Sequence, residues 1–224
     1  MSPDGKFSLK KQLVRIFDFI FGADSDTIRL ENMPAEELLS LAGRKRSRTD
    51  EGGRFCALSY SNPLARKAVK LLKYHGNAKM ARLLGEVLAS EIAGFLDEES
   101  MMTDFSKPIL VPMPIGRQRR KERGFNQTEL ICHEILRNGL AGILEYRPDA
   151  LVKIKDAESQ VKARSRTERL ANLKGCFFAP EDRVSGRNII LVDDVMTTGA
   201  TAEEATRTLK KSGAKNIFFF AVAH

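Results

Sequence analysis

The apolar positions of this chain recur with helical spacing in two regions. Residues 13–20 place apolar side chains at steps of three and four, which predicts a short amphipathic helix. Residues 22–55 show no clear period and predict a variable linker. Helical spacing returns over residues 64–96, where Gly76 and Asn77 divide the region into two helices and Asn77 can cap the second.

Beyond residue 105, short apolar runs alternate with helical stretches. We expect strands at Ile109–Met113, Leu151–Ile154, Asn188–Val192 and Asn216–Val222. We expect helices at 126–137, after a capping box at 165–168, and after a second capping box at 201–204. This alternation predicts an α/β fold with an open, mainly parallel sheet flanked by helices. The predicted organisation is an N-terminal helix and variable linker over residues 1–57, followed by one domain over residues 58–224.

The charge balance indicates anionic partners. The 37 Lys and Arg residues against 29 Asp and Glu give a net charge of +8, which suits phosphate esters, nucleic acid or a membrane surface. Cys56, Cys132 and Cys176 lie far apart without CxxC spacing, which excludes a sequence-evident zinc ribbon and fits a reducing compartment. Charges at Arg15 and Asp18 interrupt the first apolar stretch, and no run is long enough to span a membrane. We therefore expect a cytoplasmic protein.

The most specific chemical signal follows the strand at 189–192. Two carboxylates, Asp193 and Asp194, are followed by a Thr-Thr-Gly loop that leads into a helix. Such a loop directs backbone N–H groups and hydroxyls to one point at a helix N-terminus, which favours a phosphate. The carboxylates would repel the phosphate but suit the hydroxyls of a sugar attached to it, directly or through Mg²⁺. The alternative is that the carboxylates end the strand and the loop is an ordinary turn.

This segment resembles the signature of the type I phosphoribosyltransferases for 5-phosphoribosyl 1-pyrophosphate (PRPP). The resemblance implies that Asp193 and Asp194 hold the ribose hydroxyls, act in catalysis and serve Mg²⁺, directly or through ligand or water. It assigns the 5-phosphate to Thr197, Thr198, Gly199, Ala200 and Thr201.

A second signal follows the strand at 109–113, where residues 117–123 carry five cations and one acid. Arginine matches phosphate oxygens with two parallel hydrogen bonds, so this segment suits a pyrophosphate. The residues that we expect to bind it are Ile115, Gly116, Arg117 and Arg123. The alternatives are a solvated basic loop or a nucleic-acid surface.

A third signal is the polar, cationic segment between residues 151 and 174. It could form a flexible cover that excludes water from a charged ligand. The residues expected in this cover are Gln160, Arg164 and Arg169. An exposed helix face explains the same pattern equally well.

These segments together resemble the ComF family of amidophosphoribosyltransferase-like proteins linked to natural competence. The matching features span residues 60–224 and are Lys73-Tyr74-x-Gly76, Val-Pro-x-Pro at 111–114, the block Arg123-Gly124-Phe125-Asn126-Gln127, and Gln160 with Arg169 and Asn172. Family members commonly carry an N-terminal zinc-binding element rich in cysteine, but residues 22–55 contain no cysteine. We therefore expect no zinc in this protein. The resemblance to the phosphoribosyltransferases implies Mg²⁺ as the cofactor.

Two functions fit these features. The first is an enzyme that transfers ribose 5-phosphate from PRPP to an acceptor with release of pyrophosphate. The second is a non-catalytic ComF-type protein that binds PRPP or a nucleotide and acts through single-stranded DNA or a competence-protein partner. A nonspecific nucleic-acid binder would explain the charge but not the carboxylate pair. The acceptor does not follow from the sequence, because variable segments form acceptor pockets in this fold.

Overall fold

A parallel five-stranded sheet forms the centre of the computed structural model, which describes residues 25–42, 53–102, 105–155 and 172–224. Its spatial order is β1-β7-β6-β2-β3, and every neighbouring pair runs parallel. The strands are β1 (Arg54–Leu58), β2 (Ile109–Pro112), β3 (Glu145–Tyr146), β6 (Ile189–Val195) and β7 (Ile217–Ala223). The predicted open parallel sheet is confirmed.

Two further short strands lie outside this sheet. The strand predicted at residues 151–154 is β4 (Val152–Lys153), and it pairs antiparallel with β5 (Phe177–Phe178). Strands β4 and β5 therefore form a separate two-stranded sheet.

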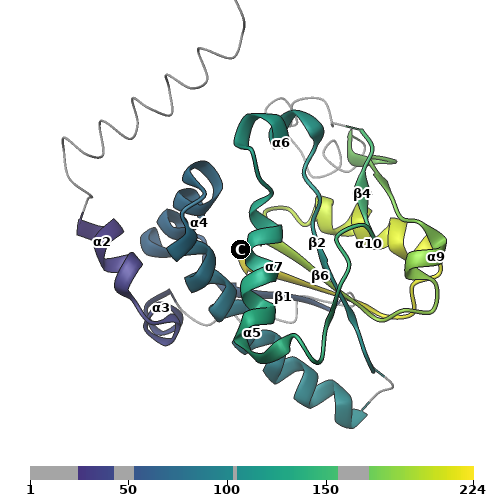
Figure 1. The fold of residues 1–224 in the computed structure, drawn as a ribbon, viewed down its shortest axis with the longest axis horizontal. Helices are drawn as coiled ribbons and strands as arrows, with labels where there is room; N and C mark the ends of the chain where they lie inside the picture. The colour runs from purple at the N-terminus through teal and green to yellow at the C-terminus, as the bar shows by residue number, and fades with distance from the viewer. Residues whose placement is uncertain (1–24, 43–52, 103–104, 156–171) are drawn as a thin grey trace, which may run out of the picture.

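Helices cover both faces of the sheet (Figure 1). The described helical segments are α2 (Ser25–Asn32), α3 (Ala35–Ala42), α4 (Pro63–His75), α5 (Ala78–Met102), α6 (Arg117–Arg123), α7 (Gln127–Ile135), the π-helical turn η2 (Leu136–Leu140), α9 (Glu181–Val184) and α10 (Ala200–Lys211). The break predicted at Gly76 and Asn77 is confirmed, since Gly76 ends α4 with φ 60° and Asn77 Oδ1 accepts the Lys79 N–H at 2.9 Å. None of the described helices is long and apolar enough to cross a bilayer.

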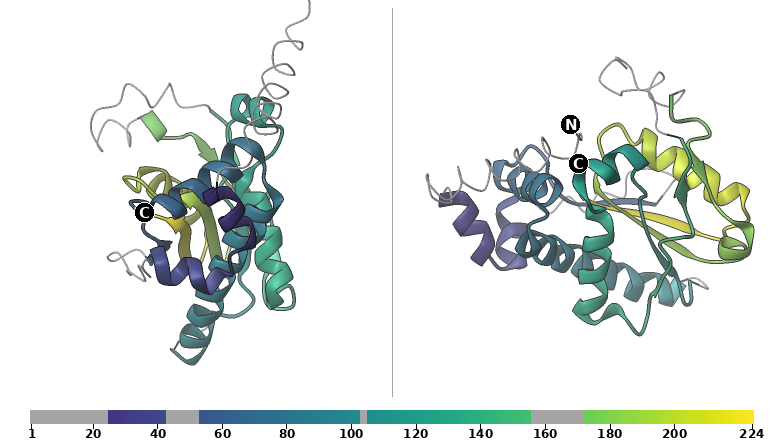
Figure 2. Two further views of the ribbon diagram at one scale, coloured as in Figure 1. Left: turned by 90° about the vertical axis from the view of Figure 1, so that its left-hand side faces the viewer. Right: turned by 45° about the horizontal axis from the view of Figure 1, so that its top comes forward.

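The alternation of side chains along β6 produces two hydrophobic cores. Ile190 and Val192 join the core beneath α4, α5 and α7, whereas Ile189 and Leu191 join the core beneath α10. Successive side chains of a strand point to opposite faces, so a strand that is apolar at every position must be covered on both. Figure 2 shows these two helical layers on either side of the sheet.

The N-terminal region differs from the expected irregular linker. Two helices, α2 and α3, lie within residues 22–55, and Leu30, Leu38 and Leu39 are buried in the core that α4 and α5 share. Each helix has only eight residues, so tertiary packing rather than sequence periodicity stabilises it. The helical N-terminal extension is confirmed, while the helix expected at residues 13–20 lies outside the described residues. Strand β1 lies across the expected boundary at residue 57.

The capping box predicted at Thr201–Glu204 is wrong. Helix α10 begins at Ala200, two residues before the start that an N-cap at Thr201 implies, because Gly199 adopts φ 76° and occupies the N-cap position. The Glu204 carboxylate instead accepts the Gly175 N–H at 2.7 Å and pairs with Arg207. The other predicted capping box, at residues 165–168, lies outside the described residues.

Candidate functional site

The candidate site lies at the carboxyl edge of the sheet, where β2 and β6 end side by side. Pro112 of β2 is level with Val192 of β6, directly before the two carboxylates. Beyond this edge, β2 leads through Gly116 into α6, and β6 leads through a short loop into α10. Ligands of open α/β sheets bind at the carboxyl ends of the strands, so the geometry agrees with the predicted position.

The two carboxylates are held by their own backbone. Asp193 Oδ1 accepts the N–H of Asp194, and Asp194 Oδ1 accepts the N–H of Val195, both at 2.8 Å. Asp194 is only 4% exposed, and its Oδ2 atom has no hydrogen-bond partner. Lys73 Nζ lies 3.2 Å from this oxygen as an ion pair, at an angle that makes no hydrogen bond. The charge of Lys73 therefore balances this buried carboxylate oxygen, which accepts no hydrogen bond.

The setting of Asp193 disfavours its ionised form. Burial raises the pKa of Asp193 well above its ordinary value, and the negative charge of Asp194 raises it further. Lys73 opposes this effect through its positive charge. A buried carboxyl of raised pKa is stabilised by a ligand that brings hydroxyl donors or a divalent cation.

Lys73 of α4 and Arg123 of α6 bring positive charge to these carboxylates. The Arg123 side chain is half-buried, donates to Gln127 Oε1 at 2.9 Å, and lies 5.7 Å from the centre of the Tyr74 ring. Burial lowers the pKa of Arg123, and the nearby Asp194 carboxylate opposes this change. Arg123 and Asp194 are thus close enough to interact electrostatically.

The basic segment predicted as a loop is the short helix α6. Its cations Arg117, Arg119, Arg120 and Lys121 are exposed, and Arg120 pairs with Glu129. Ile115 and Gly116 precede this helix, with Gly116 at its N-cap. Of the two arginines expected at a pyrophosphate, Arg123 is half-buried and lies close enough to Asp194 for their charges to interact, whereas Arg117 is exposed.

The block of residues 123–127 and the Lys-Tyr-x-Gly segment are in contact. Gly124 ends α6 with φ 82°, and Phe125 lies against Gly76, where an added Cβ would come within 2.9 Å of its ring. Asn126 caps α7 and donates to the Met113 carbonyl at 3.1 Å, which fixes the end of β2. These contacts join two segments that are far apart in the chain. Lys73 comes from one of them and Arg123 from the other.

The loop after the carboxylates has the features expected of a phosphate cradle. Thr198 is half-buried, Thr197 is exposed, and Ala200 and Thr201 form the first turn of α10. No side chain caps α10, so the N–H groups of its first turn have no side-chain acceptor at the cap. Gly199 has φ 76°, a conformation that other residues adopt only with strain.

Two residues near the site did not appear among the predicted site residues. Arg54 Nη1 of β1 lies 3.1 Å from the position that a Cβ on Gly199 would occupy. Lys73 appeared only as part of a matching motif, although a lysine three residues before a helix-ending glycine was a usable signal. Arg54 gave no sequence signal, because its position depends on the pairing of β1 with β7.

Several expected site features lie elsewhere. Gln160, Arg164 and Arg169, the expected flexible cover, lie outside the described residues. Within the described ranges, no group of three or more His, Cys, Asp or Glu side chains could hold a metal ion. A cation at the carboxylate pair would therefore take its other ligands from a bound molecule or water.

The comparisons with known proteins agree with this geometry. Residues 136–224 match the model of the phosphoribosyl transferase domain. The chain is 30% identical over 153 residues to the competence protein ComFC of Bacillus subtilis (strain 168), which covers 68% of this chain and 56% of that protein. It is 28% identical over 159 residues to the DNA utilization protein YhgH of Escherichia coli O157:H7, which covers 70% of this chain and 66% of that protein.

A partial similarity to a solved structure was also found. The glutamine PRPP amidotransferase from B. subtilis complexed with ADP and GMP has a TM-score of 0.38 and 16% identity, over 63% of this chain and 25% of that chain. The chain thus spans between half and two thirds of the length of the curated relatives that it matches. The domain match and the two relatives identify a protein that carries a phosphoribosyl transferase domain over residues 136–224 and that resembles the ComF family.

Proposed function

We propose that this protein binds PRPP at the carboxyl edge of β6 and transfers its ribose 5-phosphate to an acceptor. The observation that carries the proposal is the carboxylate pair Asp193 and Asp194, which precedes a glycine loop, forms an ion pair with Lys73 and interacts with the charge of Arg123. An acidic pair beside a phosphate cradle and two cations is complementary to a ribose that bears phosphates at both ends.

Each part of the site has a task in this reaction. Asp193 and Asp194 accept hydrogen bonds from the two ribose hydroxyls, and the first turn of α10 binds the 5-phosphate. Arg123, with Gly116 at the start of α6, takes the pyrophosphate that leaves. Breaking the bond at the anomeric carbon builds positive charge on the ribose, which the two carboxylates stabilise electrostatically. Positioning and charge stabilisation then supply most of the rate enhancement.

The carboxylates also fit Mg²⁺, because the buried Asp194 Oδ2 atom has no hydrogen-bond partner. Asp193 and Asp194 would hold the ion together with oxygens of the bound ligand or water. The ion would neutralise charge on the leaving pyrophosphate. Lys73, which pairs with Asp194, would share this neutralisation.

Calorimetric titration with PRPP and Mg²⁺ tests the binding step. The Asp193→Asn, Asp194→Asn double variant should bind more than about tenfold more weakly, because it loses two hydrogen bonds to charged groups. Glu36→Gln with Glu37→Gln is a matched control, since it neutralises an adjacent acid pair on α3, away from the site. Equal affinities of wild type and the Asp193, Asp194 variant would contradict the assignment of the ribose.

A non-catalytic role is the second candidate, in which the protein acts through DNA or a competence-protein partner. The exposed cations of α6 favour it, as do the names of the two relatives, a competence protein and a DNA utilization protein. A pyrophosphate-release assay across nucleobases, ammonia and glutamine separates the two candidates. PRPP binding without release, together with oligonucleotide affinity that falls steeply with salt, would favour the second.

A further inference from the structure

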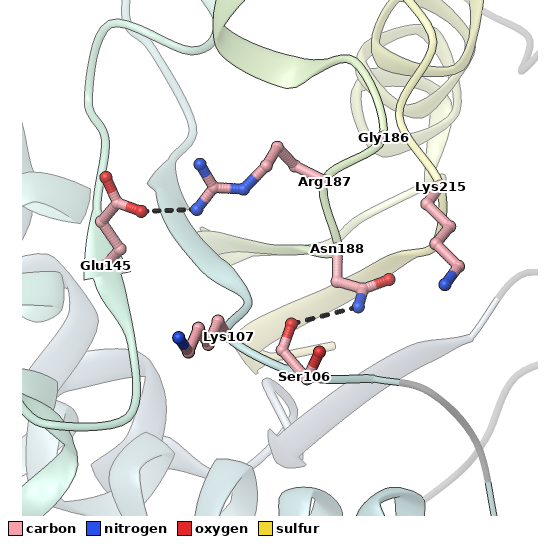
Figure 3. A pocket seen from close by; sticks show the side chains of 7 residues that line it. All are labelled: Ser106, Lys107, Glu145, Gly186, Arg187, Asn188 and Lys215. Atoms are coloured by element: carbon pink, nitrogen blue, oxygen red, sulfur yellow. Dashed lines mark hydrogen bonds and ion pairs between the residues drawn. The ribbon is translucent and has the colours of Figure 1, made fainter.

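A polar pocket lies at the amino edge of the sheet, opposite the carboxyl edge where the candidate PRPP site lies. It has a volume of about 380 Å³ and is lined by Ser106, Lys107, Glu145, Gly186, Arg187, Asn188 and Lys215. These residues lie at or just before the amino ends of β2, β3, β6 and β7, as Figure 3 shows. The candidate PRPP site follows the carboxyl ends of β2 and β6, so the two sites are separate.

The lining of this pocket is cationic. Lys107, Arg187 and Lys215 bring three positive charges, and Glu145 brings one negative charge, which leaves an excess of two positive charges. Glu145 pairs with both Arg187 and Arg147, and these two guanidinium groups lower its pKa. The carboxylate therefore stays ionised and fixes the direction of Arg187, which Figure 3 shows reaching towards it. The excess positive charge of the lining favours a bound anion.

Fixed polar groups form the base of the pocket. Asn188 is 5% exposed, donates to the Ser106 carbonyl at 3.3 Å and accepts from Asn216 at 3.0 Å. The backbone carbonyl of Asn188 also accepts the Ile109 N–H at 2.8 Å. These bonds join the segments that precede β2, β6 and β7, so the pocket is built on the rigid part of the sheet.

Lys107 has an unusual backbone conformation. Its φ of 44° is the only positive φ of a non-glycine residue among the described ranges. The next residue is Pro108, which further restricts the conformations open to Lys107. A strained backbone of this kind persists only where its surroundings fix it, and such residues gather at binding sites.

We propose that this pocket binds a small phosphorylated molecule through Lys107, Arg187 and Lys215. The volume suits a compact ligand, since small-molecule sites begin at roughly 300 Å³. All seven lining residues are polar or glycine, so the lining contains no aromatic side chain on which a base could stack. Nucleic-acid sites combine phosphate contacts with aromatic stacking, which this pocket does not supply. The ligand is therefore recognised by its phosphate group.

An NMR titration of the ¹⁵N-labelled protein with inorganic phosphate tests this proposal. Saturable shifts of the Gly186 and Asn188 amide signals report the pocket, while those of Thr198 and Gly199 report the candidate PRPP loop. In the Lys107→Gln, Lys215→Gln variant, the dissociation constant from the pocket signals should rise at least about fivefold, because two exposed charges are lost. The signals of the PRPP loop should respond as in wild type. The matched control Lys70→Gln with Lys174→Gln, two exposed lysines elsewhere, should change neither set.

Three results would overturn the proposal. The first is the absence of phosphate-dependent shifts at Gly186 and Asn188. The second is an unchanged dissociation constant in the Lys107, Lys215 variant. The third is a response of the pocket signals to a single-stranded oligonucleotide but not to phosphate, which would make the pocket part of a nucleic-acid surface. Because the two sets of signals are read separately, failure here leaves the PRPP assignment untouched.

The Lys107→Gly variant distinguishes a role of Lys107 in phosphate binding from a role in the stability of the fold. Glycine adopts a positive φ without strain, so this variant should keep or raise the melting temperature while it weakens phosphate binding. A lower melting temperature with unchanged phosphate affinity would show that Lys107 serves the fold, and would overturn its assignment to the ligand.

Discussion

At the scale of single residues, the surroundings of Asp193 and Asp194 favour ligand binding over the stability of the ligand-free protein. Two adjacent carboxylates are partly withdrawn from water, and Lys73 is the one cation in ion-pair contact with them among the described residues. Groups arranged for binding or catalysis often reduce stability in this way, because their charges are balanced only when the ligand is present.

The pH dependence of stability tests this view of Asp193. A raised carboxyl pKa in the folded protein means that stability falls as pH rises from the unfolded value of about 4 through the folded pKa. The Asp193→Asn variant should therefore be more stable than wild type at about pH 7.5, by on the order of 1 kcal/mol, and the difference should close near pH 4. Urea unfolding of both proteins across this pH range gives the result. A wild type that is more stable than the variant at neutral pH would contradict the raised pKa.

The residues of the candidate site differ in how far the sequence reveals them. Asp193, Asp194 and Gly199 follow one another in the chain, so their chemistry could be inferred from local order alone. Arg54 reaches Gly199 only because β1 pairs with β7, and Lys73 reaches Asp194 from α4, a helix far earlier in the chain. Contacts of this kind depend on tertiary packing, which spacing along the chain does not encode.

At the scale of elements, Glu204 connects α10 to the segment that leads into β5. It is 4% exposed, accepts the Gly175 N–H and pairs with Arg207 on the same helix. Burial opposes the ionisation of Glu204, but the bonds from Arg207 and Gly175 outweigh it and lower its pKa. A buried carboxylate satisfied in this way holds the two segments together.

Glu204→Ala should destabilise the protein by about 2–3 kcal/mol, because the Gly175 N–H and the Arg207 side chain lose their shared acceptor. Glu204→Gln should cost less, since its amide oxygen can still accept the Gly175 N–H. Thermal and urea unfolding of the two variants measure the difference. Equal stability of Glu204→Ala and wild type would show that this connection adds nothing to the fold.

Several short elements did not follow from the sequence, whereas the longer ones did. Strand β6 contains a continuous apolar run, and helices α4 and α5 have helical spacing with a clear break at Gly76 and Asn77, and these predictions are confirmed. Helices α2 and α3 were missed, because eight residues hold barely two turns and their stability comes from burial against α4 and α5. Helix α6 was missed because its seven residues are almost all charged and show no apolar period.

At the scale of the whole molecule, five phenylalanines join one edge of the sheet to α5. Phe55 of β1 stacks on Phe220 of β7 with ring centres 4.7 Å apart, and Phe95 of α5 contacts both rings. Phe105 and Phe218 complete the cluster. Aromatic rings bury large areas, so this cluster binds β1 to the rest of the sheet.

Phe220→Ala should lower the free energy of unfolding by about 3–5 kcal/mol, through lost burial and the cavity that remains. Phe178→Ala on β5 is the control, because its ring is 53% exposed and its loss should cost less than about 1 kcal/mol. Urea titration followed by circular dichroism compares the two. Similar costs at both positions would show that the cluster does not hold the sheet together.

The position of β7 has a consequence for how the protein folds as it is synthesised. β7 is the last strand in chain order, yet it lies between β1 and β6, with Arg54 paired to Phe219. Until the ribosome has released residues 217–223, β1 has no neighbouring strand in the described sheet, so the edge of the sheet that carries Arg54 cannot form. Pairings between such distant segments also form slowly. Arg54 can therefore reach Gly199 only after β7 has been made and inserted between β1 and β6.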